Sequence, residues 1–339
     1  MGEKKVVLEV KGLKTSFFTD DGEVPAVDNV DFQIRQGEVL GIVGESGCGK
    51  SVTSLSIMGL VPSPPGKITG GEILFQDKDL TKLKEKQMRQ VRGNDVAMIF
   101  QEPMTSLNPL FTIGDQLREA VKIHKRDWSK KQIQERAVEM MGLVGLPRPE
   151  ALMKNYPHQL SGGMRQRVMI AMALLCDPKV LIADEPTTAL DVTIQAQILK
   201  LIKGLNDRLD MAVLMITHDL GVVAETCERV IVMYAGKVVE EGPVRTIFKN
   251  PQHPYTKGLL ASVPDMRFKK DRLYSIPGNV PKPGTIKTGC KFAARCEFAF
   301  DRCLVENPEL YQTEEAHQTR CFLYDEKEVK PDERTFVKS

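Results

Sequence analysis

The chain has 339 residues, of which 42% are hydrophobic and 27% are charged, so it is long enough to fold into two globular domains. Its formal net charge is only +2, from 47 Lys and Arg against 45 Asp and Glu, which argues against a nucleic-acid partner. Apolar runs such as 168–176 are shorter than the roughly 20 residues of a membrane-spanning helix, and residues 1–6 lack the apolar core of a signal peptide. We therefore expect a chain that is not exported and that needs other subunits for any role in transport.

The first 43 residues predict β-strands. Residues 7–10 and 30–34 have the pattern of antiparallel strands, and the glycine-bearing segment 19–23 predicts a turn between them. The run 39–43 is apolar throughout, as expected for a strand that is buried on both faces of a parallel sheet. A helix is expected over 51–60, because no breaker interrupts this segment before Gly59.

The segment between that strand and that helix has the spacing G-x-x-x-x-G-K-S, formed by Gly44, Glu45, Ser46, Gly47, Cys48, Gly49, Lys50 and Ser51. Its glycines let backbone N–H groups close around phosphates, while Lys50 reaches the outer phosphates and Ser51 offers a hydroxyl to Mg²⁺. The positive N-terminus of the following helix would face the same phosphates. A purely structural glycine turn is the alternative, but it leaves Lys50 and Ser51 unexplained.

A mostly helical insert is predicted over about 102–175. Five apolar residues recur there at helical spacing: Ile133, Ala137, Met140, Met141 and Val144. Near its end, Ser161, Gly162 and Gly163 precede a second helix start at which the backbone can approach an anion closely. Taken alone, these three residues are more often a simple helix cap than a ligand site.

Strands at 180–183 and 213–216 flank a helix at 194–209, an alternation that predicts a parallel sheet. Polar residues follow three strand ends, where parallel sheets place ligand contacts. Asp184 is suited to hold Mg²⁺, and Glu185 is our expected general base, although two acidic residues can also simply close a strand. His218 would lie near the γ-phosphate, whereas Gln101 is weak evidence by itself.

A hairpin at 229–233 and 237–240 closes the predicted nucleotide-binding domain, residues 1–250. Beyond it, frequent prolines predict an irregular second domain, residues 251–339, with short pieces of structure. Four cysteines crowd into this tail with the spacing C-x5-C-x6-C-x17-C: Cys290, Cys296, Cys303 and Cys321. Four thiolates are enough for a [4Fe–4S] cluster or for tetrahedral zinc, and four reduced thiols are the third alternative.

The motifs at 44–51, Gln101, 160–163, 181–185 and His218, in this order, resemble the nucleotide-binding domain of ABC transporters over residues 5–250. The resemblance implies an α/β P-loop NTPase fold, with a RecA-like parallel core, an antiparallel β-subdomain and the helical insert. It also implies a dimer in which each ATP lies between residues 44–51 of one subunit and the 161–163 loop of the other.

Family roles then transfer to single residues. Lys50 and Ser51 would bind phosphates and Mg²⁺, Gln101 would contact the metal and link to the permease, and Asp191 would contact the other subunit. Phe17 resembles the aromatic residue that stacks on adenine, although Phe18 could replace it or Phe17 could simply pack in the sheet. Met164 departs from the glutamine that usually ends the signature loop.

Segments 101–109, 183–195, 253–256 and 276–278 resemble the ATP-binding subunits of oligopeptide and dipeptide importers, a branch that includes nickel importers. This resemblance implies a peripheral ATPase at the cytoplasmic face of the membrane. Its partners would be a second homologous ATPase subunit, two transmembrane permeases and an extracytoplasmic peptide-binding protein. It also favours the iron–sulfur cluster over zinc, but the sequence does not choose the transported substrate.

Two other functions are compatible with parts of this sequence. Soluble ABC ATPases that act on ribosomes or DNA also occur with iron–sulfur clusters, but the ribosomal ones carry two ATPase domains and N-terminal cluster cysteines, unlike this chain. A non-hydrolysing regulatory module is disfavoured by the presence of Lys50, Asp184 and Glu185.

Overall fold

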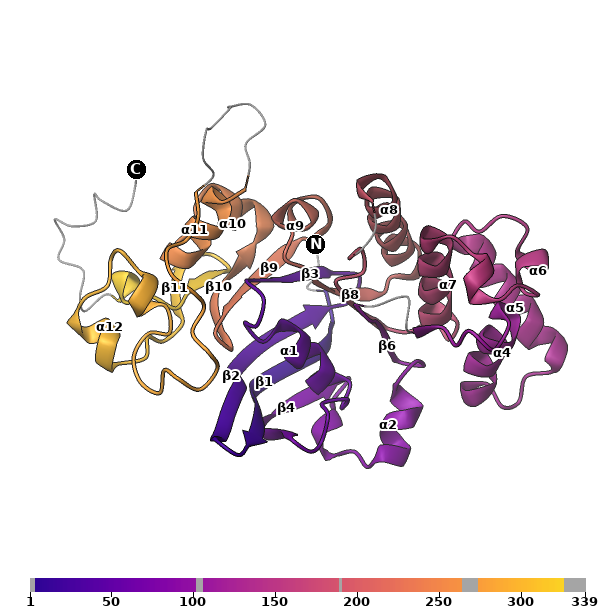
Figure 1. The fold of residues 1–339 in the computed structure, drawn as a ribbon, viewed down its shortest axis with the longest axis horizontal. Helices are drawn as coiled ribbons and strands as arrows, with labels where there is room; N and C mark the ends of the chain where they lie inside the picture. Colours follow the sequence, from indigo (N-terminus) through magenta and orange to yellow (C-terminus); the bar gives the residue numbers. More distant parts are fainter. Residues whose placement is uncertain (1–3, 102–105, 189–190, 264–273, 326–339) are drawn as a thin grey trace.

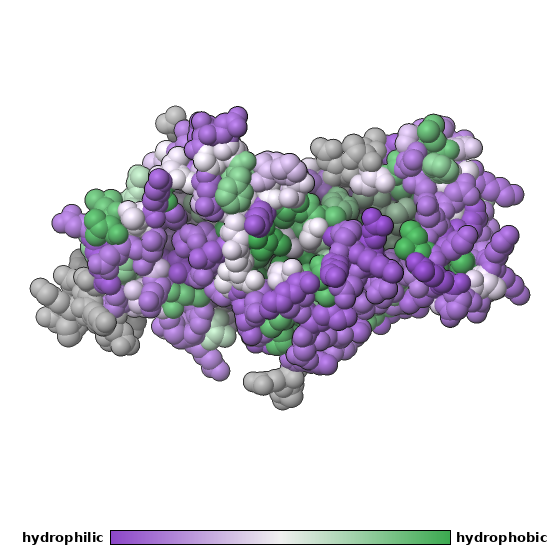
Figure 2. Space-filling view, turned by 90° about the horizontal axis from the view of Figure 1, so that it is seen from below, coloured by the Kyte–Doolittle hydropathy of each residue, from purple (hydrophilic) through white to green (hydrophobic). Residues whose placement is uncertain are grey.

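The computed structural model describes residues 4–101, 106–188, 191–263 and 274–325. A central sheet crosses the molecule, with an antiparallel sheet below it, a helical lobe on one side and the C-terminal elements on the other (Figure 1). Seen from the side of the antiparallel sheet, most of the surface is hydrophilic and the hydrophobic residues form separate patches (Figure 2). Within the described part of the chain, no helix combines the length and the apolar character needed to cross a bilayer.

The antiparallel sheet has the strand order β2-β1-β4-β5, so that β2 is one of its two edge strands. Its strands are β1 (Val6–Thr19), β2 (Gly22–Arg35), β4 (Gly66–Phe75) and β5 (Lys78–Asp79). The predicted turn lies between Thr19 and Gly22, which pair across the β1–β2 hairpin. Buried side chains such as Leu8 and Ile34 join one hydrophobic core with helix α1 and the central sheet.

The central sheet has the order β11-β12-β10-β9-β3-β8-β7-β6, and the five strands from β9 to β6 are parallel. Every residue of β3, β7 and β8 is buried, which confirms the prediction of strands covered on both faces. The strands are β3 (Val39–Val43), β6 (Val96–Ile99), β7 (Val180–Asp184), β8 (Ala212–Ile216), β9 (Arg229–Tyr234), β10 (Lys237–Pro243), β11 (Tyr311–Glu314) and β12 (His317–Thr319).

The predicted helical insert forms the lobe at the right of Figure 1. The five apolar residues predicted to share a helix face are all buried in its core. Ser129 and Ser161 cap two of its helices by accepting backbone N–H bonds. The helices of the lobe are α4 (Ile113–His124), α5 (Lys130–Leu143), α6 (Pro149–Leu152) and α7 (Gly162–Leu174), with a 3₁₀ turn η2 (Pro157–Gln159).

The remaining helices of the first 250 residues cover the two sheets and connect their strands. They are α1 (Lys50–Ile57), α2 (Glu85–Val91), α8 (Val192–Leu209), α9 (Leu220–Thr226) and α10 (Val244–Lys249), with a 3₁₀ turn η1 (Leu80–Lys82). Helix α1 begins at Lys50, directly after the phosphate loop, as the sequence predicts.

The described part of the C-terminal segment contains only short elements, as expected from its prolines. They are α11 (Pro254–Ala261), η3 (Ala293–Arg295), α12 (Asp301–Val305), η4 (Phe322–Tyr324) and the two strands β11 and β12. Strand β12 pairs with β10, so this segment extends the central sheet, which the sequence did not predict. The buried Glu240 of β10 holds the junction, because its carboxylate accepts the Gln252 and His253 N–H groups and lies 2.8 Å from His317 Nε2.

Candidate nucleotide-hydrolysis site

The predicted phosphate loop, residues 44–49, connects β3 to α1. Two of its glycines are required by space as well as by backbone conformation. A Cβ on Gly44, at φ 153°, would lie 2.2 Å from the Met233 carbonyl oxygen, and one on Gly49, at φ 103°, would lie 2.5 Å from that of Ala26. Gly47, at φ 79°, has open space at this position, and it lies with Ser46 on the exposed tip of the loop. The loop is therefore packed closely against backbone at Gly44 and Gly49, and it is exposed to solvent at Ser46 and Gly47.

Lys50 is buried and folds back over this loop. Its ammonium donates to the carbonyl oxygens of Gly44 at 2.7 Å and Glu45 at 3.1 Å. Cys48 is buried beneath the loop, and desolvation raises the pKa of its thiol. The predicted phosphate-binding cation thus lies at the loop, surrounded by groups that keep it there.

Asp184 ends β7 and faces the start of α1. Its two carboxylate oxygens accept hydrogen bonds from Ser51 and Ser54, each at 3.2 Å. Burial raises the pKa of Asp184, and the Ser51 and Ser54 hydroxyls partly offset this rise. These oxygen donors suit Mg²⁺, which usually binds one or two protein oxygens together with phosphates and water. The structure therefore brings Ser51 and Asp184 together as the sequence predicts.

Glu185 follows with a left-handed backbone, at φ 47°, that turns its side chain toward three polar partners. Its Oε2 accepts from Gln101 at 3.0 Å and from Thr188 at 2.9 Å, and its Oε1 lies 3.2 Å from His218 Nδ1. Burial acts to raise the pKa of Glu185, but the bonds from His218 and Thr188 and the charge of Lys50 bring this pKa below its usual range. Glu185 is therefore ionised at neutral pH.

The 161–163 loop lies at the start of α7, on the helical lobe (Figure 1). Ser161 caps the helix, since its hydroxyl accepts the Met164 N–H at 3.3 Å, and Gly162 has open space where a Cβ would lie. The Met164 side chain packs against the core of the lobe. Among the described residues, no hydrogen bond or ion pair joins 161–163 to 44–51. Within the described part of the chain, the two predicted anion-binding helix starts are thus not bonded to each other.

Asp191 also caps a helix, because its carboxylate accepts the Ile194 N–H at the start of α8. Buried Gln166, which sequence patterns did not single out, connects α7 to the strand end that carries Glu185 by donating to the Pro186 carbonyl oxygen. The two predicted aromatic residues lie near the end of β1, where Phe17 is half-buried and Phe18 is exposed. A Cβ on Gly66 would lie 3.0 Å from the Phe17 ring, which therefore packs closely on the neighbouring strand β4.

The C-terminal segment contacts the phosphate loop directly, and no motif predicts this. The buried side chain of Arg295 donates to both carboxylate oxygens of Glu45, at 2.8 and 3.2 Å, and to the Pro277 carbonyl oxygen. The hydroxyl of Tyr255 accepts the Glu45 N–H at 2.8 Å. Arg295 also lies over the rings of Tyr234 and Phe292. The loop is therefore held on one side by residues that follow it by more than 200 positions.

All four tail cysteines line one small cavity, whose wall also contains phenylalanines such as Phe292 and Phe322. The cavity measures about 10 Å³, which is room for about one water molecule. Across the described residues, no three His, Cys, Asp or Glu side chains are arranged to hold a metal ion. The structure thus gathers the four thiols, and the iron–sulfur cluster stays a prediction.

Comparisons with known proteins match two parts of the chain to protein families. The family described as "ABC transporter" matches residues 27–188, and "Oligopeptide/dipeptide transporter, C-terminal region" matches residues 239–303. The chain is 56% identical to the oligopeptide transport ATP-binding protein AppD of Bacillus subtilis, over 94% of this chain and 97% of that protein. It is 53% identical to the dipeptide transport ATP-binding protein DppD of the same organism, over 95% and 96% of the two chains.

The fold is also similar to that of solved ATP-binding cassettes. The cassette MJ0796, solved as a dimer in a post-hydrolysis state with ADP and Pi, matches with a TM-score of 0.62 and 30% identity, over 70% of this chain and 99% of that one. The α/β fold predicted from the sequence is thereby confirmed.

Proposed function

Because this chain belongs to the ABC transporter family of ATP-binding subunits, we propose that it hydrolyses ATP to power the uptake of peptides across the cytoplasmic membrane. The observation that carries the proposal is Glu185, an ionised carboxylate fixed by Gln101, Thr188 and His218 beside the Asp184–Ser51 pair. A residue held in this way is suited to orient and deprotonate water. The oligopeptide and dipeptide transport relatives support the peptide substrate.

In the proposed reaction, the backbone N–H groups of residues 46–51 and the Lys50 ammonium bind the phosphates of ATP. Ser51, Asp184 and Gln101 would hold Mg²⁺, which neutralises charge on the phosphates when it is bound. Glu185 accepts a proton from the attacking water, and His218, the neighbour of Glu185, donates a hydrogen bond to the γ-phosphate. Phe17 would stack on the adenine.

We propose that the active assembly contains a second homologous ATPase subunit. The 161–163 loop makes no bond to this chain's own phosphate loop within the described residues, and Gly162 leaves its backbone open to an approaching phosphate. The 161–163 loop of each subunit would close over the ATP held by the other, with Asp191 at the contact. The dimeric state of the related cassette MJ0796 supports this arrangement.

Two transmembrane permeases and an extracytoplasmic peptide-binding protein would complete the importer, with this chain attached to the permeases at the cytoplasmic face. Residues 1–250 would form the ATPase domain and residues 251–339 the domain typical of peptide importers. The test is to purify the complex from detergent-solubilised membranes, identify its subunits and measure ATP hydrolysis and peptide uptake in proteoliposomes. Glu185→Gln should retain ATP binding but lower turnover by two or more powers of ten. Normal turnover in that variant would remove Glu185 from its role.

We also propose that the four tail cysteines hold a [4Fe–4S] cluster, because thiolates are its usual ligands and all four line one cavity. Burial raises the pKa of Cys296 to about 11 and that of Cys321 to about 12, so metal binding must release protons. The small cavity requires the thiols to move apart around a cluster. Iron, zinc and acid-labile sulfide measured on the same anaerobic sample would decide between a cluster, zinc and free thiols.

A further inference from the structure

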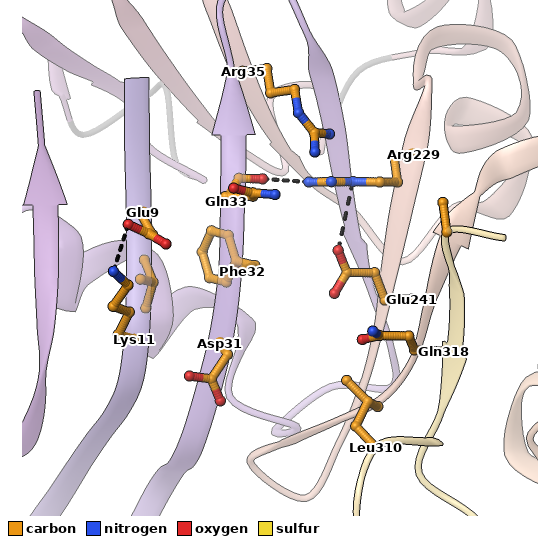
Figure 3. Close-up of a pocket in the computed structure, with 12 residues that line it drawn as sticks. Glu9, Lys11, Asp31, Phe32, Gln33, Arg35, Arg229, Glu241, Leu310 and Gln318 are labelled. Carbon is orange, nitrogen blue, oxygen red and sulfur yellow. Dashed lines mark hydrogen bonds and ion pairs between the residues drawn. The ribbon is translucent and has the colours of Figure 1, made fainter. Parts of the chain in front are cut away.

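A cavity of about 500 Å³ lies between the edge strand β2 and the strands β10 to β12, outside the nucleotide site (Figure 3). We call it the β2 groove. One wall contains residues of β2, and the opposite wall contains residues near β10 and β12. Its volume is within the range of about 300–1,000 Å³ that is typical of small-ligand sites. None of its lining residues belongs to the ATPase machinery described above.

Part of the β2 backbone faces this groove. Strand β2 pairs only with β1, and the Gln33 carbonyl oxygen accepts a hydrogen bond from Arg229 across the groove. Because the N–H and C=O of one strand residue point the same way and alternate along the strand, the backbone groups of Asp31 also face the groove. Side chains from both faces of β2 line the cavity, Phe32 on one and Asp31 with Gln33 on the other. The groove therefore follows the edge of the sheet.

The charged residues of the groove are unevenly paired. Lys11 binds Glu9 at 2.9 Å, and Arg229 lies 3.3 Å from Glu38 and 3.6 Å from Glu241. In contrast, Asp31 and Arg35 form no ion pair with any described residue. One Asp31 oxygen accepts the Gly12 N–H at 2.7 Å, which leaves the other oxygen available.

Asp31 and Arg35 are four residues apart on the same face of β2. At about 3.3 Å per residue, their Cα atoms are separated by roughly 13 Å along the strand. The groove thus presents a carboxylate at one end and a guanidinium at the other, beside the apolar side chains of Phe32 and Leu310 (Figure 3). Between these charges the Gln33 carbonyl oxygen is already bonded to Arg229, so the backbone groups of Asp31 are the ones open to a ligand.

We propose that the β2 groove binds a short peptide of three or four residues with free termini, extended along β2. The peptide ammonium pairs with the Asp31 carboxylate, its carboxylate pairs with Arg35, and its backbone bonds the strand edge at Asp31. Three or four extended residues span roughly 10–13 Å, which matches the two charges, whereas a single amino acid is too short to reach both. The site is independent of the proposed transport function, because it uses no residue of the ATPase site.

The proposal is tested by isothermal titration calorimetry on the full-length chain with tetra-alanine and with its N-acetylated and C-amidated forms. We expect a Kd of roughly 10–100 µM for the free peptide and at least about tenfold weaker binding when either terminus is blocked. Arg35→Gln should weaken binding of the free peptide by a similar factor, but it should not further weaken binding of the amidated peptide. Asp31→Asn should likewise weaken binding of the free peptide without further weakening binding of the acetylated peptide.

Arg126→Gln and Asp127→Asn are matched controls, since they make the same substitutions at exposed positions of the helical lobe and should leave the Kd unchanged. Hydrogen exchange provides a second measurement: bound peptide should slow exchange in residues 22–35, as expected for an added strand. The absence of binding at millimolar peptide would overturn the proposal. So would equal affinity for the blocked peptides, which would indicate a site for an internal protein segment, or equal losses in the control variants.

Discussion

The phosphate loop is held from two sides by very different means. On the core side, its glycines pack against backbone carbonyls of β9 and β2, where no side chain fits. On the C-terminal side, Arg295 and Tyr255 bind Glu45 through side chains that are 250 and 210 positions away in the chain. Both sets of contacts restrict the same few residues, but only the glycines of the core side can be recognised from the local sequence.

This difference predicts different consequences of mutation. Contacts to backbone leave no room to adjust, so changes on the core side should affect the whole fold. Contacts through side chains fix the position of the loop after the fold has formed, so changes on the C-terminal side should be smaller and should appear in ATP binding. The C-terminal segment would then be a positioning element for the ATPase as well as an attachment to the sheet.

The largest effect is expected for Gly44→Ala on the core side. Its Cβ would lie 2.2 Å from the Met233 carbonyl oxygen, a distance that forces the backbone to move. We expect the free energy of unfolding to fall by at least about 3 kcal/mol, measured by urea titration with circular dichroism. Gly142→Ala is the matched control, because it adds a Cβ in open space within α5 and should be neutral or slightly stabilising. Similar stability of the two variants would refute the close packing of the loop.

The second effect concerns pH and the cap of α11, the helix that carries Tyr255. His253 Nδ1 accepts the Tyr255 N–H, and burial lowers the pKa of His253 to about 4 from 6.5. As the pH falls, His253 therefore takes up a proton in the unfolded chain before it does so in the folded chain. The stabilising contribution of neutral His253 is complete above about pH 6.5 and is lost as the pH falls toward 4. Between pH 7 and pH 5 this loss should be about 2 kcal/mol.

His253→Asn keeps a cap acceptor and removes the titrating group. Urea unfolding at pH 7 and pH 5 should therefore show a pH-dependent loss about 2 kcal/mol smaller in this variant than in the wild type. All other residues are the same in both proteins, so a difference in pH dependence reports on residue 253. An identical pH dependence in the two proteins would show that folding does not lower the pKa of His253.

The third effect tests Arg295 as a positioning residue. Arg295→Met removes both bonds to Glu45, which is partly exposed and can be solvated instead. We expect the free energy of unfolding to fall by about 1.5 kcal/mol and KM for ATP in the assembled complex to rise roughly three- to tenfold, with kcat nearly unchanged. Arg89→Met, which breaks an exposed pair with Glu85, is the control. A fall in kcat without a change in KM would argue for a role other than loop positioning.

Local sequence patterns predicted the position of the phosphate loop on the core side, but they did not predict the contacts from the C-terminal side. The run 39–43, the spacing of Gly44 to Ser51 and the strand end at Asp184 are local features, and the structure places them as predicted. Glu185 was predicted as a base, but its partner Thr188 was not. Arg295, Tyr255 and the pairing of β12 with β10 depend on contacts between distant segments, which no local periodicity encodes.

The smallest effect is expected for Tyr255→Phe, which removes a single hydroxyl from the C-terminal side. The Glu45 N–H then loses its acceptor while the ring keeps its packing against Tyr234 and Phe292. Because this N–H is partly buried, we expect a stability loss of about 1 kcal/mol and a rise of KM for ATP of less than about threefold. Tyr274→Phe, at an exposed tyrosine, should change neither quantity. If Tyr255→Phe raised KM more than Arg295→Met, the loop would be positioned mainly through its backbone, and the arginine would serve the packing of the tail.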